Sequence, residues 1–146
     1  FSSPSIFWCP AINFAIETAM RLSEQLSLRW ENIDLTKHTA FLSAQITKGN
    51  RNRTVPLTDK AIEVLNQIPR HIHGKVFPMS LNYHNKGWRT LIKRAGIVGL
   101  RWHDLRREAT SRLNLFLYFS FNWIFYCSLY KIKFPYTNIY LILHLI

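Results

Sequence analysis

The chain has 146 residues, which is enough for one domain with a hydrophobic core. Its 19 Lys and Arg residues against 8 Asp and Glu give a formal net charge of +11, which favours a polyanionic partner, nucleic acid first and an anionic membrane second. The two cysteines, Cys9 and Cys127, lie far apart, so the composition indicates neither a disulfide framework nor a zinc site.

The N-terminal part predicts an irregular lead-in followed by two helices. Residues 1–10 contain two prolines and three serines, and because residue 1 is Phe we expect a fragment or a processed chain. From residue 11 onward apolar residues recur at i, i+3, i+4 and i+7, which predicts an amphipathic helix. A second helix follows, with Leu22, Leu26 and Trp30 as its core-facing residues.

The middle of the chain predicts a β-hairpin with a basic tip. Residues 39–46 have the composition of a strand, and residues 48–52 (K-G-N-R-N) are turn-forming. The strand composition resumes over residues 53–57, where Pro56 should end the strand. Two interpretations stay open at this point. The basic residues either solvate an exposed sheet edge and so resist aggregation, or they lie along the backbone of a nucleic acid.

Two more amphipathic helices follow, separated by a loop. Thr58 or Asp59 is expected to cap the first helix, and Gly96 is a suitable C-cap for the second. The Lys and Arg side chains of the second helix are either solvated or directed at a nucleic acid backbone. His71 and His73 form an H-x-H pattern in the loop. No third ligand stands at a suitable spacing, so we expect no metal site there.

A further helix begins within the sequence R-W-H-D-L-R, where His103 and Arg106 are three residues apart and therefore lie on one face. An imidazole exchanges protons near neutral pH, and a guanidinium is a planar, permanently charged fork. The pair therefore suits a phosphate better than a carbonyl. Taken alone the pattern is weak, because an ordinary surface helix that begins with solvated arginines explains it too.

Three motifs stand in order along the chain. The first is R-x-x-E from Arg21 to Glu24, followed by L-x-L-R-W-E-x-I-D. The second is T-K-G-x-R-x-R-T-V-P-L around Lys48, and the third is H-D-L-R. In this order they resemble the catalytic domain of the tyrosine recombinases, also called phage integrases, over about residues 11–113. The resemblance implies an α+β fold, a mainly helical catalytic domain with a small antiparallel β-sheet or hairpin.

The resemblance also implies catalytic roles for individual residues. Arg21 and Arg106 would bind the nonbridging oxygens of a DNA phosphate, where negative charge builds in the transition state. Glu24 would orient Arg21. Lys48 would protonate the leaving 5′-oxygen, and His103 would help to move the proton of the nucleophile or hold the phosphate.

Intact members of the family carry out site-specific DNA recombination and integration for phages and other mobile elements. A tyrosine attacks a DNA phosphodiester and forms a 3′-phosphotyrosyl link, and the hydroxyl of a second strand then reverses the step. The resemblance implies DNA as the partner, with Arg51 and Arg53 contacting its backbone, and no metal, cofactor or small-molecule substrate. It also implies a bacterial cytoplasmic location on DNA, and tetramers on DNA for intact relatives.

The end of the chain departs from the family pattern. Residues 115–146 contain no Asp or Glu and keep no amphipathic period, so we interpret them as a hydrophobic, aromatic-rich tail, frameshifted or run-on, after a partial catalytic domain at residues 11–114. The family continues from H-x-x-R through a Gly-His pair to the nucleophile, but no glycine follows Gly99. Tyr136 stands near the distance expected for the nucleophile, in a segment where tyrosines are frequent.

The expected protein is therefore an inactive integrase fragment that binds DNA weakly, because covalent catalysis cannot turn over without its nucleophile. Two alternatives belong to other classes. One is a noncatalytic DNA-binding module. The other is a small membrane-associated protein anchored by the uncharged residues 113–130, in which Asn and Ser residues make a membrane span marginal.

Overall fold

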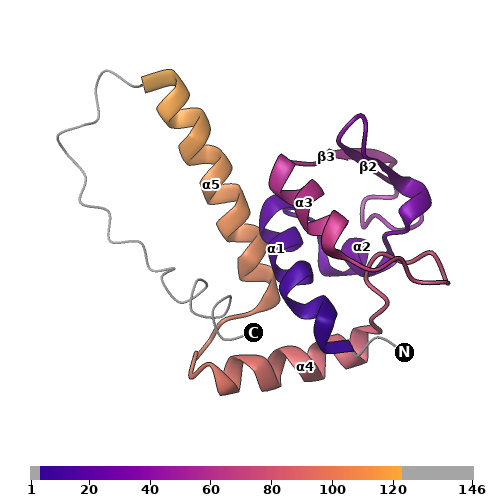
Figure 1. Cartoon of the computed structure of the whole chain (residues 1–146). Coiled ribbons are helices and arrows are strands. Elements are labelled where there is room, and N and C mark those ends of the chain that lie inside the picture. The colour runs from indigo at the N-terminus through magenta and orange to yellow at the C-terminus, as the bar shows by residue number, and fades with distance from the viewer. Residues whose placement is uncertain (1–3, 123–146) are drawn as a thin grey trace.

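The computed structural model describes residues 4–122, with side chains for residues 6–112. In chain order the elements are the 3-10 helix η1 (Pro4–Phe7), α1 (Trp8–Thr18), α2 (Leu22–Ser27), the 3-10 helix η2 (Trp30–Asn32), β1 (Ile33–Asp34), β2 (Thr39–Leu42), β3 (Arg53–Pro56), α3 (Asp59–Gln67), α4 (Leu81–Arg94) and α5 (Trp102–Asn122). Helices dominate and one small antiparallel sheet accompanies them (Figure 1), which confirms the predicted α+β class.

Helix α1 lies at the centre of the described fold. It packs against α3 and α5 and lies between them in Figure 1. Seven of its eleven residues are buried, and the polar Asn13 and Glu17 are only partly buried, as expected for an amphipathic helix. The expectation of an irregular lead-in is wrong for residues 4–10, which are helical. Phe7 and Trp8 are buried in the core and extend the helix, and Pro10 is tolerated because it lies in the first turn.

The sheet has the order β1-β2-β3, and both pairings are antiparallel. Ala40 pairs with Val55 and Leu42 with Arg53, so one face of the hairpin carries the buried Ala40, Leu42 and Val55. The structure corrects two expected bounds. Residues 33–34, for which the sequence predicts no strand, form β1, and β2 ends at Leu42 instead of continuing to residue 46.

Polar side chains replace the strand ladder in the connection from β2 to β3, residues 43–52, and this explains the early end of β2. The Thr47 hydroxyl donates to the Arg51 carbonyl oxygen at 2.8 Å and accepts from the Arg51 amide at 3.2 Å. The Ala44 amide donates to Asn52 Oδ1 at 2.7 Å. The hairpin therefore has a longer and internally bonded tip than the sequence predicts.

Helices α3 and α4 follow the sequence prediction. The Thr58 hydroxyl caps α3 by accepting from the Ala61 amide at 3.1 Å, and Gly96 follows α4 with the left-handed φ of 66° that favours glycine. The loop between them carries His71 and His73, whose rings lie 5.0 Å apart. Among the described residues no three potential metal ligands gather in one place.

The start of α5 is held by a group of aromatic side chains. Trp102 lies 4.3 Å from His84 and 5.0 Å from Trp88, measured between ring centroids, and Trp8 lies 5.1 Å from His84. His84 is fully buried, and burial lowers the pKa of its imidazole below the ordinary value. Within the part of the chain that the structure describes, no helix is long and apolar enough to cross a membrane.

Candidate phosphate-binding site

A sharp reversal of the chain places Arg21 directly after α1. The helix ends at Thr18, whose hydroxyl donates to the Phe14 carbonyl oxygen at 2.7 Å. Ala19 then adopts a left-handed conformation with φ 51°, and its amide donates to the Ala15 carbonyl oxygen at 3.1 Å. This tight turn brings Arg21 to the N-cap position of α2.

Glu24 ties Arg21 to the start of α2. Its Oε2 accepts the backbone amide of Arg21 at 2.9 Å, and its Oε1 accepts Nη1 of the same residue at 3.1 Å. A carboxylate three residues into a helix commonly returns to the N-cap amide in this way. Here the carboxylate is 0% exposed while the Arg21 side chain is 41% exposed. The R-x-x-E motif therefore caps the start of α2 and also holds the Arg21 guanidinium in place.

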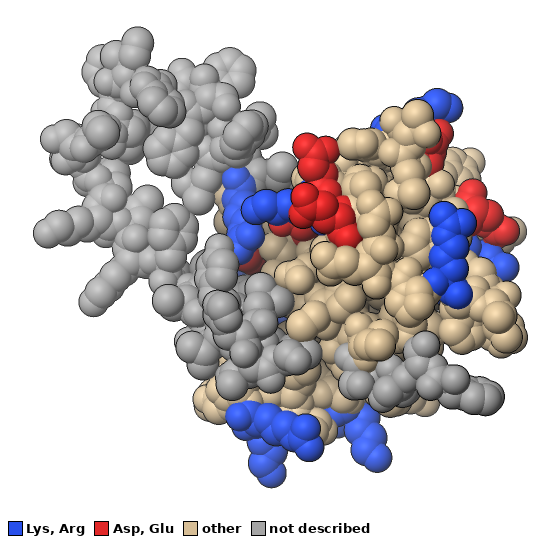
Figure 2. All heavy atoms as spheres, in the orientation of Figure 1, with Lys and Arg blue, Asp and Glu red and all other residues tan. Residues whose placement is uncertain are grey.

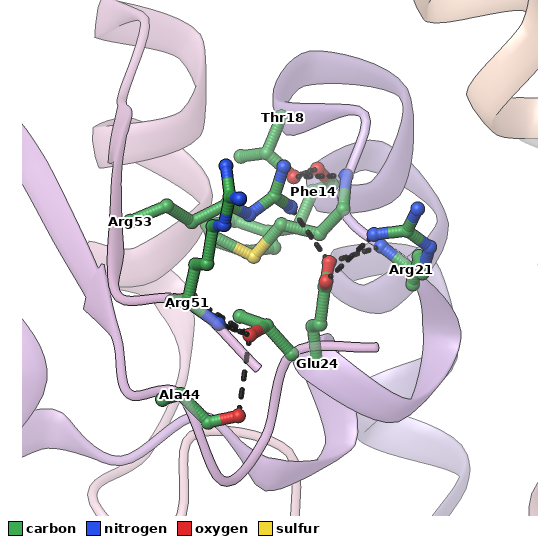
Figure 3. Close-up of polar contacts among 9 residues, drawn as sticks. Phe14, Thr18, Arg21, Glu24, Ala44, Arg51 and Arg53 are labelled. Atoms are coloured by element: carbon green, nitrogen blue, oxygen red, sulfur yellow. Dashed lines mark hydrogen bonds and ion pairs between the residues drawn. The ribbon is translucent and has the colours of Figure 1, made fainter. Parts of the chain in front are cut away.

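Arg53 brings a second guanidinium to the same carboxylate. Its Nη2 donates to Glu24 Oε2 at 2.7 Å, across 29 residues of sequence, and Figure 3 shows Glu24 between Arg21 and Arg53. A buried carboxylate needs such compensation, because its desolvation is costly without charged and hydrogen-bonding partners. The sequence predicts Arg53 as a contact to the DNA backbone and does not predict this ion pair. The signal was present, since Arg53 and the buried Val55 are two apart on a strand and share a face.

Arg106 on α5 lies beside these charges. The pKa of its guanidinium is lowered, first by partial burial, then by the positive charge of Arg21 and by that of Arg53, while the Glu24 carboxylate acts in the opposite sense. Arginine remains charged under such shifts. Two guanidiniums, those of Arg21 and Arg53, thus bind one buried carboxylate, and the guanidinium of Arg106 lies within range of their charges. We call Arg21, Glu24, Arg53 and Arg106 the guanidinium cluster.

His103 lies on the same side of α5 as Arg106. The two residues line one hollow of about 280 Å³ together with Arg107, Thr110 and Ser111. The helix start that orients them uses the Asp104 carboxylate, whose Oδ2 accepts the Arg101 amide at 2.8 Å. The predicted spacing of His103 and Arg106 therefore does place both side chains at one surface, next to the cluster.

Other predicted site residues are not part of this cluster. Lys48 and Arg51 are exposed on the connection from β2 to β3, and no ion pair joins either side chain to another described residue. Tyr136 lies outside the described residues. The structure thus places Arg21, Glu24 and Arg53 in direct contact, with Arg106 and His103 nearby on α5. Lys48 lies in the middle of the connection that ends at Arg53.

The arrangement of helices and sheet has a counterpart among solved structures. It is similar to the integrase of the transposon Tn1549, solved in complex with circular intermediate DNA, with a TM-score of 0.54 and 16% sequence identity. The likeness covers 73% of this chain and 44% of the integrase chain. The described fold is therefore that of an integrase.

Sequence comparison gives the family. The profile of the phage integrase family matches residues 8–115, and the chain belongs to that family. It is 43% identical over 100 residues to the shufflon-specific DNA recombinase of Escherichia coli, covering 68% of this chain and 26% of the recombinase. It is 33% identical over 120 residues to the integrase of Salmonella phage P22, covering 70% and 31% respectively. The chain thus spans less than a third of the length of either relative.

Proposed function

We propose that this chain binds DNA phosphates through the guanidinium cluster, and that the cluster is the phosphate-binding part of a tyrosine recombinase acting in site-specific recombination. One observation carries the proposal. Arg21 and Arg53, which are far apart in sequence, bind a single buried carboxylate, and Arg106 from α5 lies within range of their charges. Two positive charges remain after Glu24 is counted, which is suited to an anion at the surface of the cluster.

The chemistry of guanidinium fits a phosphodiester. Arg21 uses one Nη for Glu24 and stays 41% exposed, so further N–H groups remain for a ligand. Arg21 and Arg106 can each offer two parallel N–H bonds to nonbridging oxygens. Donors that are already fixed in place stabilise the charge of a transition state without reorganising first. Glu24 supplies this fixation for Arg21.

We further propose supporting roles for His103 and Lys48. His103 shares a hollow with Arg106, which is where it would hold the phosphate or pass on a proton. Lys48 would protonate the leaving 5′-oxygen when the connection that carries it lies against DNA. Arg51 on the same connection would contact the backbone.

Helix α4 offers a second basic surface that would attract the DNA backbone. Its solvent side carries four exposed residues, Lys86, Arg89, Lys93 and Arg94. Figure 2 shows basic side chains along the lower edge of the molecule, where α4 lies in Figure 1. Contacts of this kind carry no sequence information and weaken as salt is added, because they act by displacing counterions.

The proposal separates binding from turnover. We propose that residues 11–114 hold the phosphate and that the chain does not cleave it, since no glycine follows Gly99 and Tyr136 is a weak candidate for the nucleophile. DNA as the partner is supported by the similarity to a shufflon-specific DNA recombinase and to an integrase solved in complex with DNA. The protein would act on DNA in the bacterial cytoplasm, and the tetramers expected of intact relatives would assemble there.

Binding of the chain to labelled duplex DNA, measured by fluorescence anisotropy over a range of salt concentrations, tests the site. Arg21→Ala and Arg106→Ala should each weaken binding about tenfold, because each removes charge-assisted hydrogen bonds to a phosphate. Lys60→Ala is the matched control, since Lys60 is an exposed lysine on α3. If Arg21→Ala and Arg106→Ala both bind DNA as tightly as the parent chain, the proposed site is wrong. Dependence on Arg51 and α4 alone would favour a noncatalytic DNA-binding module.

A denaturing gel of the same mixture tests turnover. We expect no covalent DNA adduct, because the nucleophile and the Gly-His element are not in their family positions. A slow-migrating adduct that disappears in Tyr136→Phe would contradict this part of the proposal and establish Tyr136 as the nucleophile.

A further inference from the structure

We propose that Arg53 is a positioning residue, which holds the Lys48-bearing connection, residues 43–52, in place against the guanidinium cluster. The role of the cluster toward DNA rests on the proposed function. The tether itself rests on the contacts of Arg53. This differs from the role expected from the sequence, in which Arg53 contacts the DNA backbone.

The first argument comes from the position of Arg53 in the sheet. Its pairing with Leu42 is the last pairing of β2 with β3, so the ladder stops where the connection begins. Within the connection, the described hydrogen bonds are local and involve Thr47, Asn52 and their neighbours. Local bonds give the connection its shape but do not attach it to α2. The ion pair from Arg53 Nη2 to Glu24 Oε2, at 2.7 Å, makes that attachment.

The second argument comes from burial. Glu24 is 0% exposed, and the Arg53 side chain is 37% exposed. Arg53 Nε is buried and has no hydrogen-bond partner among the described residues, so it is closed to a ligand that approaches from solvent. One N–H group of this guanidinium therefore binds Glu24, and a second faces the interior of the fold. Arg51, two residues earlier, is exposed and has the same charge.

The third argument is that one carboxylate serves two arginines. Glu24 Oε2 accepts both from the Arg21 amide and from Arg53 Nη2, while Oε1 accepts Arg21 Nη1. Removing Arg53 leaves Oε2 with a single partner and frees the carboxylate to turn. The guanidinium of Arg21 then loses its fixed direction. A change at Arg53 should therefore act on ligand binding through Arg21.

Amide hydrogen exchange tests the tether without DNA. In Arg53→Gln, exchange across residues 43–52 should rise about tenfold because the connection opens more often, while Arg51→Gln should leave it unchanged. Arg53→Lys keeps a cation near Glu24 and should restore part of the protection. Unchanged exchange in Arg53→Gln overturns the inference. If Arg53→Gln does not fold, Arg53→Lys decides, because it should still show faster exchange confined to this connection.

A double-mutant cycle on duplex DNA tests the coupling to Arg21. If Arg53 positions Arg21, the double variant Arg21→Gln/Arg53→Gln should bind about as weakly as Arg21→Gln alone. A direct phosphate contact would instead give additive losses and lower the salt slope by about one for Arg53→Gln, as expected for Arg51→Gln. Additive losses overturn the positioning role. If the parent chain does not bind DNA, the proposed function fails, and the exchange result alone decides this inference.

Discussion

Helices α2 and α5 begin with the same local device, and comparing them shows what makes a site. In each, an arginine at the N-cap is followed three residues later by a carboxylate that accepts its amide. The distances are 2.9 Å from Arg21 to Glu24 and 2.8 Å from Arg101 to Asp104. As sequences, R-L-S-E and R-W-H-D are equally good helix-start signals. By spacing alone, either arginine could be the one that binds phosphate.

Burial separates the two. Glu24 is 0% exposed and pairs with two guanidiniums, whereas Asp104 is 24% exposed and pairs with Arg107 at 3.8 Å, the far end of the range for an ion pair. The start of α5 is held by the packing of Trp102 on His84 instead. A motif therefore locates a helix start, and tertiary contacts decide whether its charges become part of a binding site.

The largest expected effect comes from removing the two carboxylates in parallel. Glu24→Ala should lower the free energy of unfolding by about 2–3 kcal/mol, because it breaks a buried pair, although the exposed parts of both arginines can still be hydrated. Asp104→Ala should lower it by about 1 kcal/mol, the usual worth of a helix cap. Urea unfolding measures both. Equal losses would mean that the shared ion pairs add no stability beyond capping.

Lowering the pH should lower the free energy of unfolding through His84, which packs against the start of α5. Burial holds the pKa of this imidazole below the ordinary 6.5, so below pH 6.5 the unfolded chain takes up a proton that the folded chain does not. The folded state therefore has its full stability above pH 6.5, where His84 is neutral in both states. It loses stability as the pH falls from 6.5 toward the lowered pKa of the folded state. His84→Leu should remove this pH dependence.

The control for that measurement is His103→Gln, since His103 is exposed at the same helix start. Urea unfolding of the three proteins above and below pH 6.5 compares them. A parent chain whose stability does not change over this range, or a His84→Leu variant that keeps the full change, would contradict the prediction.

The smallest expected effect concerns the turn before α2. Ala19 has a φ of 51°, which costs a residue with a side chain about 1–2 kcal/mol, while glycine adopts it freely. After the greater flexibility of glycine in the unfolded chain is subtracted, Ala19→Gly should raise stability by about 0.5 kcal/mol. Thermal unfolding measures the change. Ala15→Gly, within α1, is the control and should be destabilising by about 1 kcal/mol. Destabilisation by Ala19→Gly would show that the Ala19 methyl matters more than the strain.

Much of this molecule could be predicted from local sequence. The cap at Thr58, the stop at Gly96 and the helix start before His103 each depend on neighbouring residues, whose conformational preferences act over one or two turns. The order of the three motifs was also sufficient to predict the family. These features were accessible because each is encoded within about a dozen residues, where periodicity and capping operate.

Other features were decided by the tertiary structure alone. The early end of β2 depends on how the Thr47 and Asn52 side chains bond within the connection. The burial of His84 depends on Trp8 and Trp102, which come from two other helices. The partner of Arg53 lies 29 residues away. The amino-acid sequence by itself determined which residues carry positive charge and where helices begin. Only folding decided which of those charges share a buried carboxylate, because desolvation, and with it the need for a partner, arises only when the chain packs.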